Sequence, residues 1–240
     1  MSRRADAGLA ALEAAVTTCR RCPRLVAWRE QVAQDKRASF KDDIYWGRPI
    51  PGFGDPRARV MILGLAPAAH GANRTGRVFT GDRSGDFLFA SLHRTGFASQ
   101  PTSVSVGDGL ELTGAWITAA VRCAPPANKP TPDERDRCLP WTVAELQHVA
   151  DVRVVVCLGA FAWDAALRLR VALGHAPPRP KPKFGHGALW YDDDGPARGR
   201  SSFALLGTYH PSQQNTFTGV LTEQMLDAVF TTARDMAGLT

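Results

Sequence analysis

The sequence lacks any apolar run long enough to cross a membrane. Residues 1–15 contain arginines but no leucine-rich segment followed by small residues, so we expect a helix there and not a signal peptide. No internal repeat and no linker of biased composition divides the chain. We therefore expect a cytoplasmic protein without a membrane partner, folded as one domain over residues 1–240.

Lysine is scarce, and arginine supplies most of the positive charge. The formal net charge of +6 gives the surface an excess of positive charge. A basic surface suits a polyanion such as nucleic acid, because neutralised phosphates release their counterions. Many basic proteins bind no nucleic acid, so the charge permits this partner without identifying it.

Cysteine is limited to five residues, and in a reducing compartment disulfides are a poor explanation for them. Cys19 and Cys22 form a Cys-x2-Cys pair followed by proline, whereas Cys123 and Cys138 lie far along the chain. Four soft thiolates satisfy either zinc or an iron–sulfur cluster, and their spacing does not separate the two. The competing interpretation is four unrelated buried cysteines. Cys157, within the apolar run VVVCL, is expected to be a small buried hydrophobic residue.

Apolar segments typical of buried strands alternate with helix-forming segments along the chain. This alternation predicts an α/β fold with a mostly parallel sheet. Predicted strands cover residues 60–65, 115–121, 152–158 and 203–206, with a short one at 188–191. Predicted helices cover residues 3–18, 25–40, 86–97, 131–149 (interrupted by Pro140), 160–173 and 222–237.

A long glycine-rich loop, GLAPAAHGANRTGRVFTGDRSG at 64–85, follows the first predicted strand. Ligands bind at the carboxyl ends of parallel strands, and long loops in compact domains are usually functional, so we interpret it as the floor of an active site. Asp82, its sole carboxylate, either orients water or caps the next helix. Phe79 is either a stacking platform for a base or an apolar anchor for the loop.

A second loop, GTYHPSQQNTFTG at 207–219, follows the strand predicted at 203–206. Its His210 is held by a following proline, at the same edge of the predicted sheet as loop 64–85. This position suits a general acid, a general base or a stabiliser of a developing anion. The alternative is a turn histidine that caps the end of the strand.

The chain resembles the uracil-DNA glycosylase superfamily, specifically its family 5 enzymes. The resemblance rests on these two loops, on the segment VRCAPPANKPTP at 121–132, and on the four cysteines Cys19, Cys22, Cys123 and Cys138. The resemblance spans nearly the whole chain and lies in the order and spacing of the motifs. It implies a three-layer α/β/α domain with a central, mostly parallel four-stranded sheet, the uracil-DNA glycosylase fold. It also implies hydrolysis of the N-glycosidic bond to a damaged base in DNA. The implied cofactor is a 4Fe–4S cluster bound by Cys19, Cys22, Cys123 and Cys138.

The chain departs from the related family 4 enzymes at two positions. Leu65 stands where those enzymes carry a water-binding glutamate, and Ala119 aligns with their base-reading asparagine. Both departures fit family 5, whose members accept a wider set of bases. A methyl group at the base edge leaves no polar atom unpaired, so we expect release of hypoxanthine and etheno-cytosine as well as uracil.

We interpret the chain as a monofunctional DNA glycosylase that acts as a monomer on DNA containing uracil or deaminated bases, in the first step of base excision repair. No lysine is marked as an activated nucleophile, so strand cleavage is not expected. The alternative is a non-catalytic, zinc-stabilised nucleic-acid-binding module, which explains the cysteines and the charge but not the two converging loops. The predicted catalytic residues are Asp82, His210 and Asn128, the predicted base-binding residues are Phe79, Gly64, Ala68, His70 and Ala119, and the predicted DNA-binding loop contains Ser212, Gln213, Gln214 and Asn215.

Overall fold

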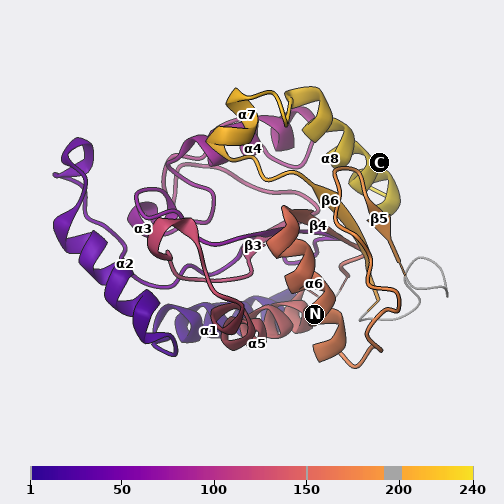
Figure 1. Cartoon of the computed structure of the whole chain (residues 1–240), viewed down its shortest axis with the longest axis horizontal. Helices are drawn as coiled ribbons and strands as arrows, with labels where there is room; N and C mark the ends of the chain where they lie inside the picture. The colour runs from indigo at the N-terminus through magenta and orange to yellow at the C-terminus, as the bar shows by residue number, and fades with distance from the viewer. Residues whose placement is uncertain (1, 150, 192–201, 240) are drawn as a thin grey trace.

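The computed structural model describes residues 2–149, 151–191 and 202–239. Within these residues the chain forms a six-stranded sheet with the order β1-β3-β2-β4-β6-β5 (Figure 1). The α/β class is as predicted, and the number of strands is corrected from four to six because two short edge strands extend a parallel core of four. The inner, parallel strands are β3 (Ala115–Ala119), β2 (Val60–Gly64), β4 (Val154–Leu158) and β6 (Ala204–Thr208). The antiparallel edge strands are β1 (Phe53–Gly54) and β5 (Leu189–Trp190).

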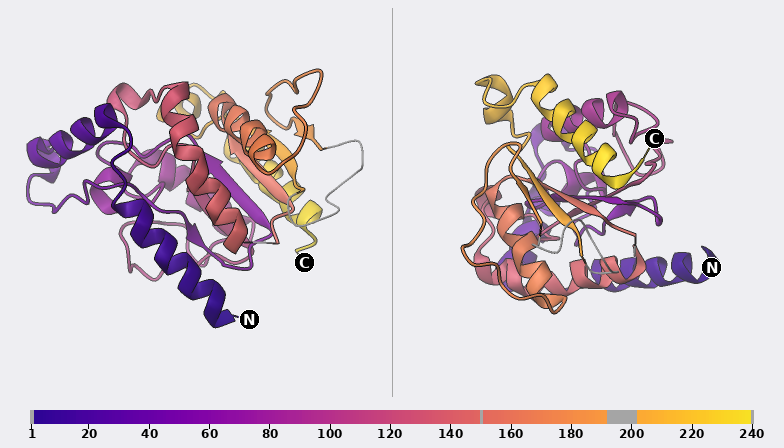
Figure 2. Two further views of the ribbon diagram at one scale, coloured as in Figure 1. Left: turned by 90° about the horizontal axis from the view of Figure 1, so that it is seen from below. Right: turned by 90° about the vertical axis from the view of Figure 1, so that its right-hand side faces the viewer.

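Helices cover both faces of the sheet, which gives three layers (Figures 1 and 2). One face carries α4 (Arg83–Arg94) and α8 (Glu223–Ala237), which also pack against each other. The other face carries α6 (Ala160–Ala172), with α5 (Pro132–His148) beside it. Outside these layers, α1 (Ser2–Thr17) packs along α5, and α2 (Pro23–Asp35) extends away from the sheet.

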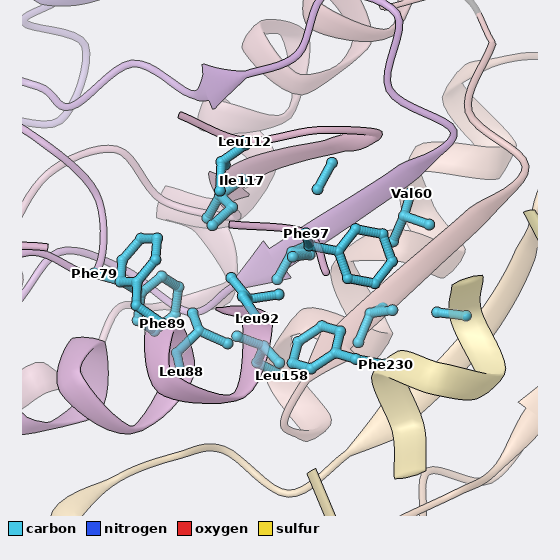
Figure 3. Close-up of a cluster of buried hydrophobic side chains, with 14 of the residues drawn as sticks. Val60, Phe79, Leu88, Phe89, Leu92, Phe97, Leu112, Ile117, Leu158 and Phe230 are labelled. Carbon is cyan, nitrogen blue, oxygen red and sulfur yellow. The ribbon is translucent and has the colours of Figure 1, made fainter. Parts of the chain in front are cut away.

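The sheet is apolar on both faces, as parallel strands between two helical layers require. Successive residues of β2 point to opposite sides. Val60 and Ile62 join the cluster beneath α4 and α8, which Figure 3 shows. Met61 and Leu63 join the cluster on the α5 and α6 side. No helix in the described part of the chain has both the length and the apolar composition needed to span a membrane.

Local backbone geometry shifts the ends of several predicted elements. The helix predicted at 25–40 ends at Asp35, because Lys36 has a φ of 53°, outside the helical region. The helix predicted at 86–97 begins earlier, at Arg83, because the side chain of Asp82 caps it there. Pro140 does not interrupt α5, which continues through it to His148.

Candidate functional site

A cavity of about 1320 Å³ lies at the carboxyl ends of the parallel strands. Most of its lining comes from the loop 65–84 after β2 and from the segment 210–217 after β6. This is the sheet edge at which the sequence predicts that the two loops meet. Nine of the predicted site residues line the cavity: Ala68, His70, Phe79, Asp82, Asn128, His210, Ser212, Gln213 and Gln214.

The loop 65–84 is folded tightly on itself. A single helical turn, α3 (Ala72–Thr75), lies in its middle, and the Arg74 guanidinium donates to two carbonyl oxygens of the loop, one on each side of that turn. The carboxylate of Asp82 packs so closely on Gly71 that a Cβ at position 71 would lie 2.1 Å from its oxygen. Glycine is therefore required at position 71, and the closed loop holds the Asp82 carboxylate at the cavity wall.

Asp82 lies where it caps a helix and also lines the cavity, the two roles considered for it. Its side chain accepts a hydrogen bond from the Gly85 N–H at 3.0 Å and so caps α4. The same residue lines the cavity. Burial raises the pKa of Asp82 above its usual range, although the N–H groups of Gly85 and Ser84 act in the opposite direction. Capping and contact with a ligand are therefore compatible roles for this residue.

His210 follows β6 closely, and its half-buried imidazole lines the cavity. Burial lowers the pKa of His210 to about 4, so the ring is neutral at pH 7. The loop backbone is held from within, because Asn215 Nδ2 donates to the His210 carbonyl oxygen at 2.9 Å. The cavity wall thus holds a neutral imidazole, whose N–H group is able to donate a hydrogen bond to a ligand.

Phe79 lies between the apolar core and the cavity. Its φ is 53°, which is uncommon for a residue with a side chain. The ring packs so closely on Gly64 at the end of β2 that a Cβ there would lie 2.7 Å from it. The ring centroid lies 6.0 Å from that of His210. Only 8% exposed, Phe79 belongs to the cluster in Figure 3 and anchors the loop while still lining the cavity.

His70 is a second imidazole in the cavity lining. Tyr45 Oη lies 3.0 Å from His70 Nδ1 and accepts a hydrogen bond from the Arg37 N–H at 3.4 Å. Burial lowers the pKa of His70, and the guanidinium groups of Arg37 and Arg74 lower it further. His70 is therefore also neutral at pH 7, with its Nδ1 engaged by Tyr45.

The four cysteines predicted as ligands line one small pocket of about 20 Å³. Cys123 and Cys138 are buried, whereas Cys19 and Cys22 are half-buried, and none of them forms a disulfide within the described ranges. Burial raises the pKa of Cys123 to about 11 and that of Cys138 to about 12. Cys157 is buried in β4 and does not line this pocket, as predicted.

Hydrogen-bond donors reach two of the four sulfurs. Arg29 Nη1 donates to Cys123 Sγ at 2.9 Å, and the Arg122 N–H donates to Cys138 Sγ at 3.3 Å. Donors of this kind oppose the effect of burial on the pKa of Cys123 and Cys138, because they stabilise the thiolate that a metal ligand must be. Across the residues that the structure describes, no three His, Cys, Asp or Glu side chains are arranged to hold a metal ion.

The match to a known protein family includes both loops that line the cavity. The family described as the uracil DNA glycosylase superfamily matches residues 51–234, a range that contains both cavity loops. The chain belongs to the uracil-DNA glycosylase superfamily. It is 56% identical to a type-5 uracil-DNA glycosylase of Mycobacterium bovis over 229 residues, which cover 95% of this chain and 81% of that protein.

Further relatives agree with the type-5 resemblance. A type-5 uracil-DNA glycosylase of Thermus thermophilus is 51% identical over 224 residues, covering 93% of this chain and 96% of its own. A type-4 uracil-DNA glycosylase of Archaeoglobus fulgidus is 31% identical over 114 residues, covering 47% of this chain and 49% of its own. The family 5 resemblance inferred from the motifs is therefore confirmed.

Three predicted site residues of this superfamily member stand outside the cavity lining. Gly64 and Ala119 face each other in register at the ends of β2 and β3, and both are buried. Ala119 belongs to the same apolar cluster as Phe79. Ala119 is 3% exposed and is not part of the cavity lining, so a role for it at the base edge stays a prediction. Asn215 turns inward to the His210 carbonyl oxygen instead of facing outward.

Phe217 and Arg83 lie within the two motif loops and line the cavity, but neither is among the individually predicted site residues. Phe217 is the last residue of α7 (Gln213–Phe217) and is 64% exposed. The Arg83 guanidinium carbon lies 4.9 Å from the centroid of its ring. The sequence did contain a signal for Phe217, because an aromatic residue in a loop predicted to face DNA has no core to pack into.

Proposed function

We propose that this protein is a monofunctional uracil-DNA glycosylase, which hydrolyses the N-glycosidic bond of uracil in DNA. Its similarity to enzymes named type-5 uracil-DNA glycosylase supports this activity. The observation that carries the proposal is the single cavity that brings His210 and Asp82 together at the carboxyl ends of the strands. Release of free uracil from a duplex with one U·G pair is the test. DNA binding without release would instead favour the non-catalytic binding module.

The geometry supports a mechanism in which the uracil nucleotide is first flipped out of the duplex, at a cost of a few kcal/mol. Phe79 then stacks on the base within the cavity. As the bond breaks, positive charge develops on the sugar, and the base departs with the electron pair. His210 is neutral at pH 7, and its N–H group donates a hydrogen bond that stabilises the negative charge on the departing base. Water completes the reaction by adding to C1′ of the sugar, and the proton that it loses neutralises the departed base.

Asp82 is the carboxylate that orients this water or balances the charge on the sugar, since Leu65 in the same lining has no polar group. Asn128 is a second polar candidate for contact with the base or the water. It is exposed, and its φ of 55° belongs to a tight turn after β3. The two candidates are thus the half-buried carboxylate of Asp82 and the exposed amide of Asn128.

Two substitutions separate the roles of Asp82. Asp82→Asn removes the charge but keeps a capping side chain, so base release should slow about 100-fold while the free energy of unfolding stays the same or rises. Asp82→Ala should be equally slow and should also lower the free energy of unfolding by about 1 kcal/mol, because the cap is lost. Single-turnover base release and chemical denaturation measure the two effects. An Asp82→Asn enzyme with wild-type rate would restrict Asp82 to capping.

The segment 212–219 is proposed to enter the minor groove and to fill the space left by the flipped nucleotide. Phe217→Ala should then slow release from a U·A pair by about tenfold, the effect of losing one stacking contact. Release from a U·G pair should slow less, because a mispaired nucleotide flips more easily. Val220→Ala is the control, since Val220 is also exposed but does not line the cavity. Equal losses on the two pairs would argue against insertion into the duplex.

We also propose that hypoxanthine and etheno-cytosine are released. The cavity of about 1320 Å³ is larger than the pockets of roughly 300–1000 Å³ typical of small ligands, so it has room for larger rings. Single-turnover release from otherwise identical duplexes should therefore be detectable for all three bases. Release of uracil alone would mean that a residue of the lining reads the base edge.

For the cofactor we propose a 4Fe–4S cluster bound by Cys19, Cys22, Cys123 and Cys138. The four cysteines line one pocket, as the ligands of one centre would, and four thiolates are the ligand set of a 4Fe–4S cluster. When bound, it joins the N-terminal segment to the segment 123–138.

We further propose that the protein is a cytoplasmic monomer, in keeping with its free cysteines.

A further inference from the structure

Arg29 is a buried cation whose guanidinium group faces the cysteines. It lies in α2, and its side chain is 2% exposed. Its Nη1 donates to Cys123 Sγ at 2.9 Å, and both terminal nitrogens donate to the Cys19 carbonyl oxygen, at 3.2 and 3.3 Å. One guanidinium group therefore contacts both segments that supply the four cysteines.

Arg29 shares its nearest carboxylate with a second arginine. Within the described ranges the carboxylate nearest to it is that of Glu30, 3.6 Å from Nη2. Both oxygens of Glu30 already accept hydrogen bonds from Arg20, and the side chain is 37% exposed, so solvent screens it. A shared and screened carboxylate offsets only part of the cost of burying a cation. An anion is therefore expected beside Arg29.

Arg122, the second buried arginine next to the cysteines, shows the contrast. Two of its side-chain nitrogens donate to the two oxygens of Glu145, each at 2.7 Å, and both side chains are buried. Only its backbone N–H, which carries no net charge, points at Cys138 Sγ. The charge of Arg122 is thus neutralised within the protein, whereas that of Arg29 faces sulfur.

We infer that Arg29 is the counter-cation of the cysteine centre and that it positions Cys123 as a thiolate ligand. This inference rests on the proposed iron–sulfur cluster. Four thiolates give such a centre a net negative charge, which complements the part of the Arg29 charge that the shared Glu30 carboxylate leaves unbalanced. Net charge and hydrogen bonds to the sulfurs set both the reduction potential and the retention of metal. Arg29 therefore raises the potential and slows the loss of iron.

Iron release and reduction potential test this role in the full-length, iron-loaded protein. Arg29→Gln keeps an N–H donor but removes the charge, so it should lose iron to a chelator at least about tenfold faster, with a more negative potential. Arg29→Lys keeps the charge and should stay close to wild type in potential. Arg24→Gln is the control, because Arg24 is on the same helix but pairs with Glu134 and does not contact a sulfur. It should match the wild type in both measurements.

The sign of the potential shift separates this role from a structural one. Loss of a positive charge lowers the potential, whereas looser packing of α2 raises it, because greater solvent exposure stabilises the more negatively charged reduced state. The Arg29 carbonyl oxygen, which accepts from Asn73 Nδ2 at 3.1 Å, remains in every variant. Wild-type potential and iron release in Arg29→Gln would overturn the inference. If that variant does not fold, Arg29→Lys decides, since an iron-loaded protein supports the role of charge and an iron-free one contradicts it.

The metal content of the wild-type protein is measured first. Zinc in place of iron would refute the proposed cluster, and the role of Arg29 would then be judged by zinc release from the same variants. Uracil release by the wild type is scored separately, so failure of the proposed activity remains distinguishable from failure of the role of Arg29.

Discussion

His210→Ala is expected to slow single-turnover base release by about 100- to 1000-fold, the usual cost of removing one preorganised donor from a site of charge development. Affinity for undamaged duplex should not change, because phosphate contacts dominate that binding. His186→Ala is the matched control. His186 is also half-buried, its ring lies 3.2 Å from Thr208 Oγ1 near the end of β6, and it does not line the cavity. A His210→Ala enzyme as fast as His186→Ala would remove His210 from the mechanism.

The low pKa of His210 links the same residue to the pH dependence of stability. Its pKa is about 4 in the folded chain and about 6.5 in the unfolded chain, so the unfolded chain binds more protons between these values. The contribution of His210 is therefore fully present above pH 6.5 and is lost as the pH falls toward 4. Denaturation at pH 7 and pH 5 should show a smaller pH dependence for His210→Gln. An unchanged dependence would mean that the ring is not held neutral.

Cys138→Ala is expected to abolish retention of iron and to leave a colourless, poorly soluble protein. Cys138 is buried at the pocket shared by the four cysteines, and metal binding of this kind contributes directly to the free energy of folding. Without its fourth ligand the centre no longer joins α5 to the N-terminal segment. Iron analysis, absorbance in the visible range and thermal unfolding measure the loss.

Cys157→Ala provides the control for this experiment. Cys157 is equally buried, but it lies in β4 outside the cysteine pocket, so its replacement removes one sulfur atom from the core and nothing from the centre. It should retain a full complement of iron and remain soluble. Full iron content in Cys138→Ala would contradict the assignment of the four ligands.

Much of this architecture was predictable from local sequence, because each signal involves neighbouring residues. Continuous apolar runs such as VMILG at 60–64 predict strands buried on both faces. Strand and helix then alternate, and this alternation places loops 64–85 and 207–219 at one sheet edge. The two-residue edge strands were missed in part, because two residues are too few for any periodic pattern.

The sequence by itself determined the four inner strands, the two polar loops, the set of four cysteines and the family, since composition and spacing along the chain carry all of these. Only the tertiary structure decided which side chains reach the cavity. Ala119 lies in the core and Asn215 turns toward its own loop, whereas Phe217 remains exposed at the rim. It also decided that the charge of Arg29 faces sulfur while that of Arg122 meets a carboxylate. The reason is that contacts between residues distant in sequence depend on how helices pack on the sheet, and no local pattern encodes those distances.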